Sequence, residues 1–249
     1  MSLASEYERQ FGWRPWSQVI DLLPPLAGKV VLDLGCGIGD QAAQLAERGA
    51  RVLGLDTNQE LLAAAQTRNI PNTEFRNGDL STLEDDLGVF DGIWCSFAAA
   101  YVPDLRPALA CWRQHLTPQS GWVALTEVDD FFGHEPLLPL TTSLLADYAR
   151  DALAADRYDF NMGRKLQAHL ESAGFSVTVT RTFPDRELSF DGPAEANVLD
   201  AWKSRLDRMK LLKAFCGPMF APVRDDFLIA LSRSDHRSSA KVYSCIAAF

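Results

Sequence analysis

Short apolar runs alternate with amphipathic stretches over residues 29–128. Apolar runs bounded by polar or glycine positions are typical of strands that a parallel sheet buries on both faces. The predicted strands cover residues 30–34, 51–56, 90–95 and 121–127, and a further strand ends near 77–80. Helices are predicted between them over residues 41–48, from the cap Asn58 through 60–65, and over 103–116. This alternation predicts an α/β fold.

A glycine turn follows the first predicted strand. Gly35, Gly37 and Gly39 stand at alternate positions before a helix that opens near Gln41. Glycines let the backbone turn sharply and approach a ligand closely, and the N–H groups of a helix start point toward such a ligand. A phosphate-binding loop would need Gly-Lys-Ser/Thr, which is missing here. The turn therefore predicts a nucleoside-like ligand and not a nucleoside triphosphate.

Carboxylates recur at the ends of the first three predicted strands. Asp33 precedes Asp56 by 23 residues, and Asp56 precedes Asp79 by another 23, about one strand–helix unit each. Residues at the carboxyl ends of neighbouring parallel strands line one crevice of an open sheet. We therefore expect the three acids to face one ligand.

Asp33, Gly35, Gly37 and Gly39 together resemble motif I of the class I S-adenosylmethionine-dependent methyltransferases, Asp-x-Gly-x-Gly-x-Gly. The resemblance is close over about residues 28–130 and loose beyond. It implies a Rossmann-like, seven-stranded sheet with helices on both faces and an antiparallel last strand, here predicted at 241–249. It also implies S-adenosylmethionine as cofactor and methyl transfer to an acceptor as the activity.

The resemblance further implies roles for individual residues. Asp56 would accept both ribose hydroxyls, Asp79 with the Leu80 backbone would read the adenine edge, and Asp33 would shape the turn indirectly. The expected cofactor-binding set is Asp33, Gly35, Gly37, Gly39, Asp56, Thr57, Asp79, Leu80 and Ser96. Arg14, before the first strand, is expected either to pair with the methionine carboxylate or to be a surface arginine.

Two residues are candidates for catalysis. Methyl transfer is an in-line displacement that mainly needs alignment and exclusion of water, and a base only where the acceptor arrives protonated. His134 lies in the loop after the fifth strand and is expected to act as a general base or substrate orienter, with a capping or hydrogen-bonding loop histidine as the alternative. Tyr158 precedes the helix at Gly163 and is expected to face the same pocket.

Beyond residue 128 the pattern changes. Helices are predicted over 141–155, 163–172 and 194–234, the last interrupted near Gly217-Pro218, and a sixth strand over 175–183. We expect an N-terminal helical segment at 1–28 and a methyltransferase domain at 29–249. Segments 130–172 and 194–234 are expected to form helical caps over the crevice. Such caps favour a small-molecule acceptor, methylated on an oxygen or nitrogen atom.

The composition and charge of the chain restrict the kinds of partner that it is expected to bind. The 249 residues carry a net charge of −9 and no visible Lys/Arg cluster, which disfavours nucleic acid and anionic membranes. No apolar run approaches a bilayer span, and the N-terminus lacks the pattern of a secretory signal, so we expect a cytoplasmic protein. The five cysteines show neither paired nor zinc-like spacing, which predicts reduced thiols and no metal site.

Other functions remain open at this point. The acceptor could be a protein side chain or RNA, although the residues after the fourth strand, 95–98, are Cys-Ser-Phe-Ala and not the Asn-Pro-Pro-Tyr type of base N-methylating relatives. The fold could also bind the cofactor without transferring a methyl group. The identity of the acceptor and the oligomeric state do not follow from the sequence.

Overall fold

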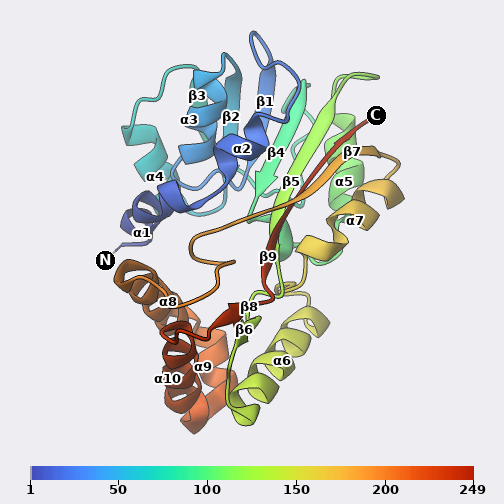
Figure 1. Ribbon diagram of the computed structural model, residues 1–249. Coiled ribbons are helices and arrows are strands. Elements are labelled where there is room, and N and C mark those ends of the chain that lie inside the picture. Colours follow the sequence, from blue (N-terminus) through green and yellow to red (C-terminus); the bar gives the residue numbers. More distant parts are fainter. Residues whose placement is uncertain (1) are drawn as a thin grey trace.

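Seven strands form one sheet in the order β3-β2-β1-β4-β5-β9-β7 in the computed structural model, which describes residues 2–249 (Figure 1). Their bounds are β1 Val30–Leu34, β2 Arg51–Asp56, β3 Thr73–Asn77, β4 Gly92–Ser96, β5 Trp122–Asp129, β7 Ser176–Phe183 and β9 Lys241–Ala248. Strands β1 to β5 pair in parallel, and β9 runs antiparallel between β5 and β7. The predicted α/β class and the antiparallel last strand are confirmed.

The strand order of the sheet changes direction between β1 and β4, which are hydrogen-bonded neighbours. Strands β2 and β3 lie on one side of β1, and β4 and β5 lie on the other. In open α/β sheets the crevice outside the carboxyl ends of the strands at such a point is the usual ligand site. The glycine turn after β1 opens at this position.

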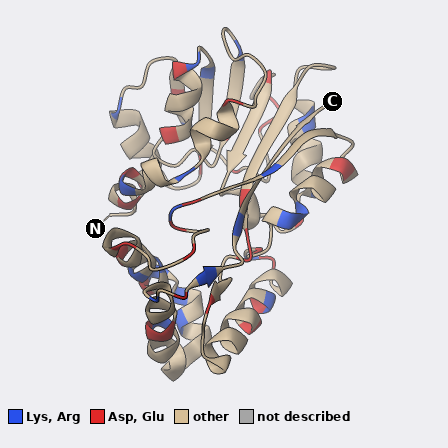
Figure 2. Ribbon diagram, in the orientation of Figure 1, with Lys and Arg blue, Asp and Glu red and all other residues tan. Residues whose placement is uncertain are grey.

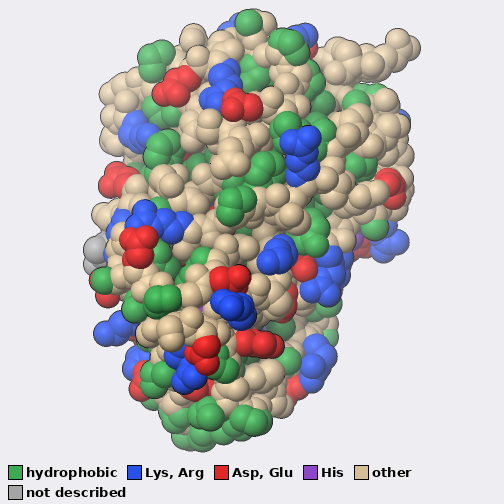
Figure 3. Space-filling model, viewed as in Figure 1, with side chains coloured by type: hydrophobic (Ala, Val, Ile, Leu, Met, Phe, Trp, Pro, Cys, Tyr) green, Lys and Arg blue, Asp and Glu red, His purple; other side chains and the backbone are tan. Residues whose placement is uncertain are grey.

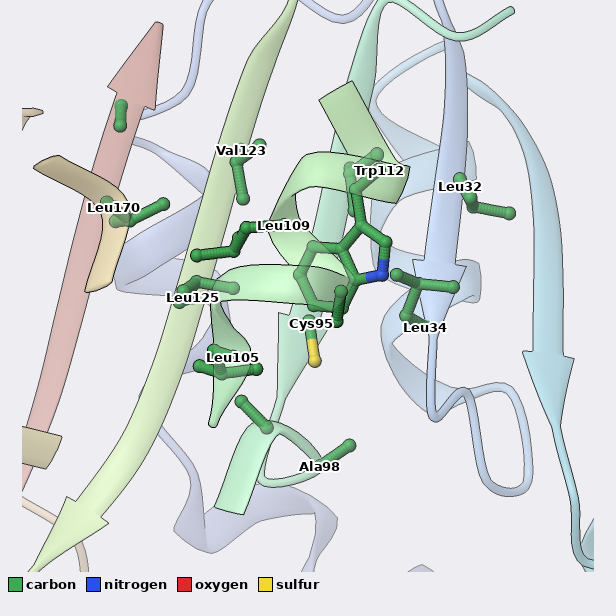
Figure 4. Packing of buried hydrophobic residues seen from close by; sticks show 14 of the residues in the cluster. Leu32, Leu34, Cys95, Ala98, Leu105, Leu109, Trp112, Val123, Leu125 and Leu170 are labelled. Carbon is green, nitrogen blue, oxygen red and sulfur yellow. The ribbon is translucent and has the colours of Figure 1, made fainter. Parts of the chain in front are cut away.

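Helices cover both faces of the sheet. Helices α2 (Trp16–Ile20), α3 (Asp40–Glu47) and α4 (Gln59–Thr67) bury their apolar residues against one face, and α5 (Leu105–Gln114) and α7 (Leu166–Ser172) against the other. Figure 4 shows the second face, where Leu105, Leu109 and Trp112 of α5 lie against the side chains of β1, β4 and β5. We call this sheet with its covering helices the sheet half.

A helical lobe adjoins the carboxyl edge of the sheet (Figure 1). It consists of α6 (Pro139–Ala154), α8 (Ala196–Arg208), α9 (Lys210–Cys216) and α10 (Phe220–Leu231), with a two-stranded sheet of β6 (His134–Glu135) and β8 (Arg237–Ser238). Its own apolar cluster centres on side chains such as Trp202 and Phe227, both fully buried. The remaining elements are α1 (Leu3–Gln10) and the short 3-10 helices η1 (Phe11–Trp13), η2 (Ala99–Tyr101), η3 (Gly163–Lys165) and η4 (Gly217–Met219).

The structure differs from the sequence-based expectations in three places. Helix α5 begins at Leu105 because Asp104 caps it through the Arg106 N–H, so Pro103 lies before the helix. The β6–β8 pairing joins segments about a hundred residues apart and was not predicted. Helix α7, expected in a cap, packs on the sheet because Leu166 and Leu170 share one face and are fully buried there. None of the helices within residues 2–249 has the length and apolar character to span a bilayer.

Candidate active site

A cavity of about 750 Å³ lies where the carboxyl edge of the sheet meets the helical lobe. Its wall includes the glycine turn, the ends of β2, β3 and β4, the N-terminal helices, and Tyr158, Leu188 and Arg205 from beyond the sheet. Of the expected cofactor-binding residues, those lining it are Gly35, Gly37, Asp56, Thr57, Asp79, Leu80 and Ser96. Asp33 and Gly39 lie behind this wall. A volume of this size is in the range of ordinary small-ligand pockets.

The glycine turn has the backbone that its sequence predicts. Gly35, Gly37 and Gly39 have φ values of +75°, +54° and +80°, which side-chain-bearing residues adopt only with strain. A Cβ on Gly35 would lie 2.4 Å from the Ala98 side chain, and one on Gly37 would lie 3.2 Å from the Tyr7 ring. The turn is therefore held between β4 and the first helix, with its backbone facing the cavity.

Asp56 at the end of β2 is anchored by two backbone N–H groups. The Gly37 N–H donates to its Oδ2 and the Asn58 N–H to its Oδ1, each at 2.8 Å. Asn58 itself caps α4 through the N–H groups of Glu60 and Leu61, as predicted. Each carboxylate oxygen keeps further acceptor capacity, so Asp56 can accept two hydroxyl groups from a ligand without losing its anchors.

Asp79 follows β3 and lines the same cavity. Its Oδ1 accepts hydrogen bonds from both the backbone N–H and the hydroxyl of Ser81, at 2.8 and 2.7 Å. The carbonyl oxygen of Leu80 accepts from the indole N–H of Trp112 at 2.6 Å. These contacts fix the backbone of the Asp79–Ser81 turn at the cavity edge.

Asp33 is fully buried beneath the glycine turn. Both of its carboxylate oxygens lack a hydrogen-bond partner among the described residues. Burial, with the nearby charge of Asp56 adding to it, raises the pKa of Asp33 to about 8. Gly39, also outside the cavity, is the N-cap of α3 and leaves no room for a side chain, since a Cβ there would lie 2.6 Å from the Phe75 ring.

The end of β4 carries a strained residue. Phe97 follows Ser96 and has φ of +55°, which is uncommon for a residue with a side chain. The hydroxyl of Ser96 accepts from the indole N–H of Trp16 at 3.0 Å, and the Arg14 guanidinium lies 5.3 Å from the centre of the Phe97 ring. Strain of this kind clusters at ligand sites, and here it turns the chain out of β4 into the cavity wall.

A buried ion network closes one side of the cavity. Arg14 donates from Nη1 to Asp185 at 2.8 Å and from Nη2 to Glu187 at 2.5 Å, and Arg205 donates from Nη2 to Glu187 at 2.7 Å. Gln10 also donates to Glu187, at 3.5 Å. The Arg14 side chain is only 6% exposed, so the surface interpretation of this residue is wrong. Both arginines line the cavity, and the two carboxylates lie behind them.

The pKa values of this network follow from its pairing. Burial alone would raise the pKa of Glu187, but Arg205 and Arg14 outweigh it and the pKa is lowered. Burial alone would lower the pKa of Arg205, but the Glu187 carboxylate raises it above its ordinary value. Glu187 and Arg205 therefore remain charged near neutral pH.

Tyr158 lies at the cavity beside Tyr101, as an edge-on aromatic pair with ring centres 4.8 Å apart. Burial raises the pKa of Tyr158 well above its ordinary value, with the Glu127 charge adding to the effect and Arg205 opposing it. The Tyr158 hydroxyl therefore stays protonated and can donate a hydrogen bond. Glu127, at the end of β5, is fully buried and accepts from the Ala100 N–H at 3.0 Å.

His134 lies outside the cavity, in the apolar cluster of the helical lobe. Its Nδ1 is 3.0 Å from Nε2 of His236, whose Nδ1 is 2.8 Å from the Gly192 carbonyl oxygen. The ring is 1% exposed and packs against Trp202 and Phe227. Burial, with His236 adding to it, lowers the pKa of His134 to about 3. The expectation that His134 acts on the acceptor therefore finds no support in the geometry, because β6 directs it into the lobe and away from the crevice.

Several cavity residues escaped the sequence analysis. Arg205 and Leu188 come from segments with no recognisable motif, and Tyr7 belongs to the N-terminal helical segment, for which no site residue except Arg14 was expected. Their position depends on contacts between distant parts of the chain, such as Arg14 with Glu187. No local sequence signal marks such contacts.

The fold and the cavity define a Rossmann-like protein with a nucleoside-type site at the carboxyl edge of its sheet. Comparisons with known proteins agree with this class. A family model described as a methyltransferase domain matches residues 31–119. The trans-aconitate 2-methyltransferase of Deinococcus radiodurans is 41% identical over 99 residues, which cover 39% of this chain and 37% of that protein. This chain thus matches well under two thirds of that relative's length.

A longer match is found with the ubiquinone biosynthesis O-methyltransferase of Pseudomonas fluorescens, 31% identical over 166 residues, covering 64% of this chain and 69% of that protein. The Haemonchus contortus phosphoethanolamine N-methyltransferase 2, solved with S-adenosylmethionine, shares the fold with a TM-score of 0.60 at 19% identity, over 98% of this chain and 56% of that chain. The chain belongs to the class I S-adenosylmethionine-dependent methyltransferases, as its motif I predicts.

Proposed function

We propose that the protein transfers a methyl group from S-adenosylmethionine to an oxygen or nitrogen atom of a small-molecule acceptor. The observation that carries the proposal is a single cavity of about 750 Å³ that joins the glycine turn, Asp56 and Asp79 to aromatic and arginine side chains of other segments. The relatives named above are called a trans-aconitate 2-methyltransferase and a ubiquinone biosynthesis O-methyltransferase, and these names support a small-molecule acceptor.

The residues present fit the cofactor. The anchored carboxylate of Asp56 suits a ribose diol, and the backbone of Gly35 and Gly37 in the cavity wall suits a close ligand. The orphaned, buried oxygens of Asp33 favour a polar donor nearby, such as a bound water or the cofactor's ammonium group. We place the adenine edge at Asp79 and Leu80, and the methionine end near Ser96 and Arg14.

When bound, the cofactor supplies a methyl carbon made electrophilic by its sulfonium. The chain then has to align the acceptor and exclude water, which are the main contributions proteins make to such displacements. Tyr101, Phe131 and Leu188 line the cavity and provide apolar surface for an acceptor. On the face shown in Figure 3, Lys and Arg stand beside Asp and Glu without a basic patch, which supports a small acceptor over nucleic acid.

The first test is a calorimetric titration with S-adenosylhomocysteine. Asp56→Ala is expected to weaken binding by about 1–3 kcal/mol, because ligand hydroxyls lose their acceptor. Asp104→Ala is the matched control, since this acid also lines the cavity but pairs with Arg106 at its exposed edge. An unchanged affinity in Asp56→Ala would contradict the ribose assignment. Absence of binding to the folded wild-type protein would contradict the proposed function.

A further inference from the structure

Three residues that follow the glycine turn at increasing distances along the chain bring hydrogen-bond donors to the cavity wall. Tyr101 follows β4, Tyr158 precedes η3, and Arg205 belongs to α8 of the helical lobe. All three line the cavity, and the two tyrosine rings are in contact. We call these three residues the donor cluster.

Arg205 lines this space and keeps one donor that no described residue engages. Its Nε and Nη2 bind Glu187, at 3.1 and 2.7 Å, and Nη1 makes no hydrogen bond with the described residues. The guanidinium lies 5.7 Å from the centre of the Phe131 ring and 5.6 Å from that of Trp202, so its plane is held in place. A guanidinium fixed on one edge by a carboxylate and open on another is suited to a second oxyanion.

The charge balance favours an anion of modest charge. Arg14 and Arg205 are matched by Asp185 and Glu187, which lie behind them and do not line the cavity. The two arginines are therefore the cationic side chains of a wall that also includes the carboxylates Asp40, Asp56, Asp79, Asp104 and Asp156, which disfavour a ligand of high negative charge. This arrangement suits a singly charged carboxylate better than a doubly charged phosphate. Figure 2 shows that acidic and basic residues are otherwise interspersed over both halves of the molecule.

We propose that the methyl acceptor carries a carboxylate group, which binds the guanidinium of Arg205 and the hydroxyls of Tyr101 and Tyr158. The inference rests on the proposed function and names the class of substrate. Phenol and guanidinium groups all donate hydrogen bonds, and a carboxylate accepts them from several directions. Tyr158 thus binds and orients the acceptor, a role that requires no proton transfer.

The experiment begins with S-adenosylhomocysteine bound to the wild-type protein, so that failure of the cofactor site is recognised first. Matched ligand pairs are then titrated into this complex: 3,4-dihydroxybenzoate with its amide, and crotonate with crotonamide, with phenyl phosphate as the phosphate probe. At least one carboxylate is expected to bind about tenfold or more tightly than its amide, the effect of a charge-assisted hydrogen bond.

Arg205→Gln is expected to reduce this preference to less than about twofold while changing the affinity for S-adenosylhomocysteine by less than about threefold. Arg208→Gln is the matched control, because Arg208 lies one turn along α8, pairs with Glu6 and does not line the cavity. Tyr101→Phe and Tyr158→Phe are each expected to weaken carboxylate binding severalfold. Arg205→Gln removes a partner of Glu187 and could therefore affect folding. Tyr101→Phe tests the proposal without this effect, because the Tyr101 side chain is 65% exposed.

Three results would overturn the inference. Carboxylates that bind no tighter than their amides, including no binding by either, would exclude a carboxylate site. Tighter binding of phenyl phosphate than of every carboxylate would assign the cluster to a phosphate. An equal loss of carboxylate and S-adenosylhomocysteine affinity in Arg205→Gln would assign the arginine to the cofactor. In each case the proposed function survives, because S-adenosylhomocysteine binding to the wild-type protein tests it separately.

Discussion

The sheet half and the helical lobe differ in how far along the chain their contacts reach. In the sheet half, the glycine turn, Asp56 and Asp79 lie within three successive strand–helix units, and the parallel register brings them to one edge. In the lobe, β6 pairs with β8 about a hundred residues away, and at its boundary Arg14 contacts Asp185 and Glu187, more than 170 residues along the chain. One wall of the cavity is therefore encoded locally and the other only by tertiary packing.

Buried acids of the sheet half and of the lobe boundary also differ in whether they form ion pairs. Asp33 and Glu127 of the sheet half are buried acids without an ion-pair partner among the described residues, although Glu127 accepts from the Ala100 N–H, and burial raises the pKa of each to about 8. The acids at the lobe boundary, Asp185 and Glu187, are paired with arginines. Unpaired buried acids are costly and are kept where a ligand or function needs them, whereas paired ones hold segments together. The comparison predicts that disrupting the pairs affects stability most.

Glu187→Ala is expected to have the largest effect of the substitutions considered, destabilising the protein by about 3–5 kcal/mol. The carboxylate is fully buried and shared by Arg14 and Arg205, so its removal leaves the buried Arg14 and the partly buried Arg205 short of a partner. Urea unfolding measures the change. Glu195→Ala is the control, because its ion pair with Arg186 is largely exposed and should contribute about 0–1 kcal/mol. Similar losses in both variants would remove the distinction between the network and ordinary surface pairs.

The reach of the contacts also explains what the sequence could predict. Val30–Leu34, the three glycines and Asn58 act within a few residues, and their strand, turn and helix cap are confirmed. The position of His134 after the fifth strand indicated the crevice, but β6 turns it toward His236. Arg205 looked like one of many charges on an amphipathic helix, because only the folded chain places it beside Glu187.

The lobe is expected to lose stability in acid through His134. Its pKa is lowered from 6.5 to about 3 in the folded protein, so the unfolded chain binds the proton more readily and stability falls as the pH drops below about 6.5. Replacement by phenylalanine removes this contribution. Between pH 7 and pH 5, the stability of His134→Phe is expected to improve relative to wild type by about 2 kcal/mol.

The control for this pH effect is Phe227→Leu, which alters the same apolar cluster without changing a titratable group. Its stability difference from wild type should be the same at both pH values. The raised pKa values of Asp33 and Glu127 act in the opposite direction, because those acids favour the folded state as the pH falls from about 8 toward 4. Comparison of variants within one pH series cancels that contribution. A flat difference for His134→Phe would show that the lobe does not titrate through this residue.

The smallest expected effect concerns a satisfied polar pair in the sheet half. The hydroxyls of Thr126 on β5 and Ser244 on β9 are hydrogen-bonded at 2.8 Å and buried. Thr126→Val and Ser244→Ala should each cost about 1 kcal/mol, because each leaves one buried hydroxyl without its partner. The double variant should cost less than the sum, since neither hydroxyl then remains, and urea unfolding of all four proteins measures the coupling. Strict additivity would mean that this hydrogen bond adds nothing to the backbone and apolar contacts that join β5 and β9. Side-chain polar pairs would then stabilise the lobe boundary, through its arginine–carboxylate pairs, but not this junction of the sheet half.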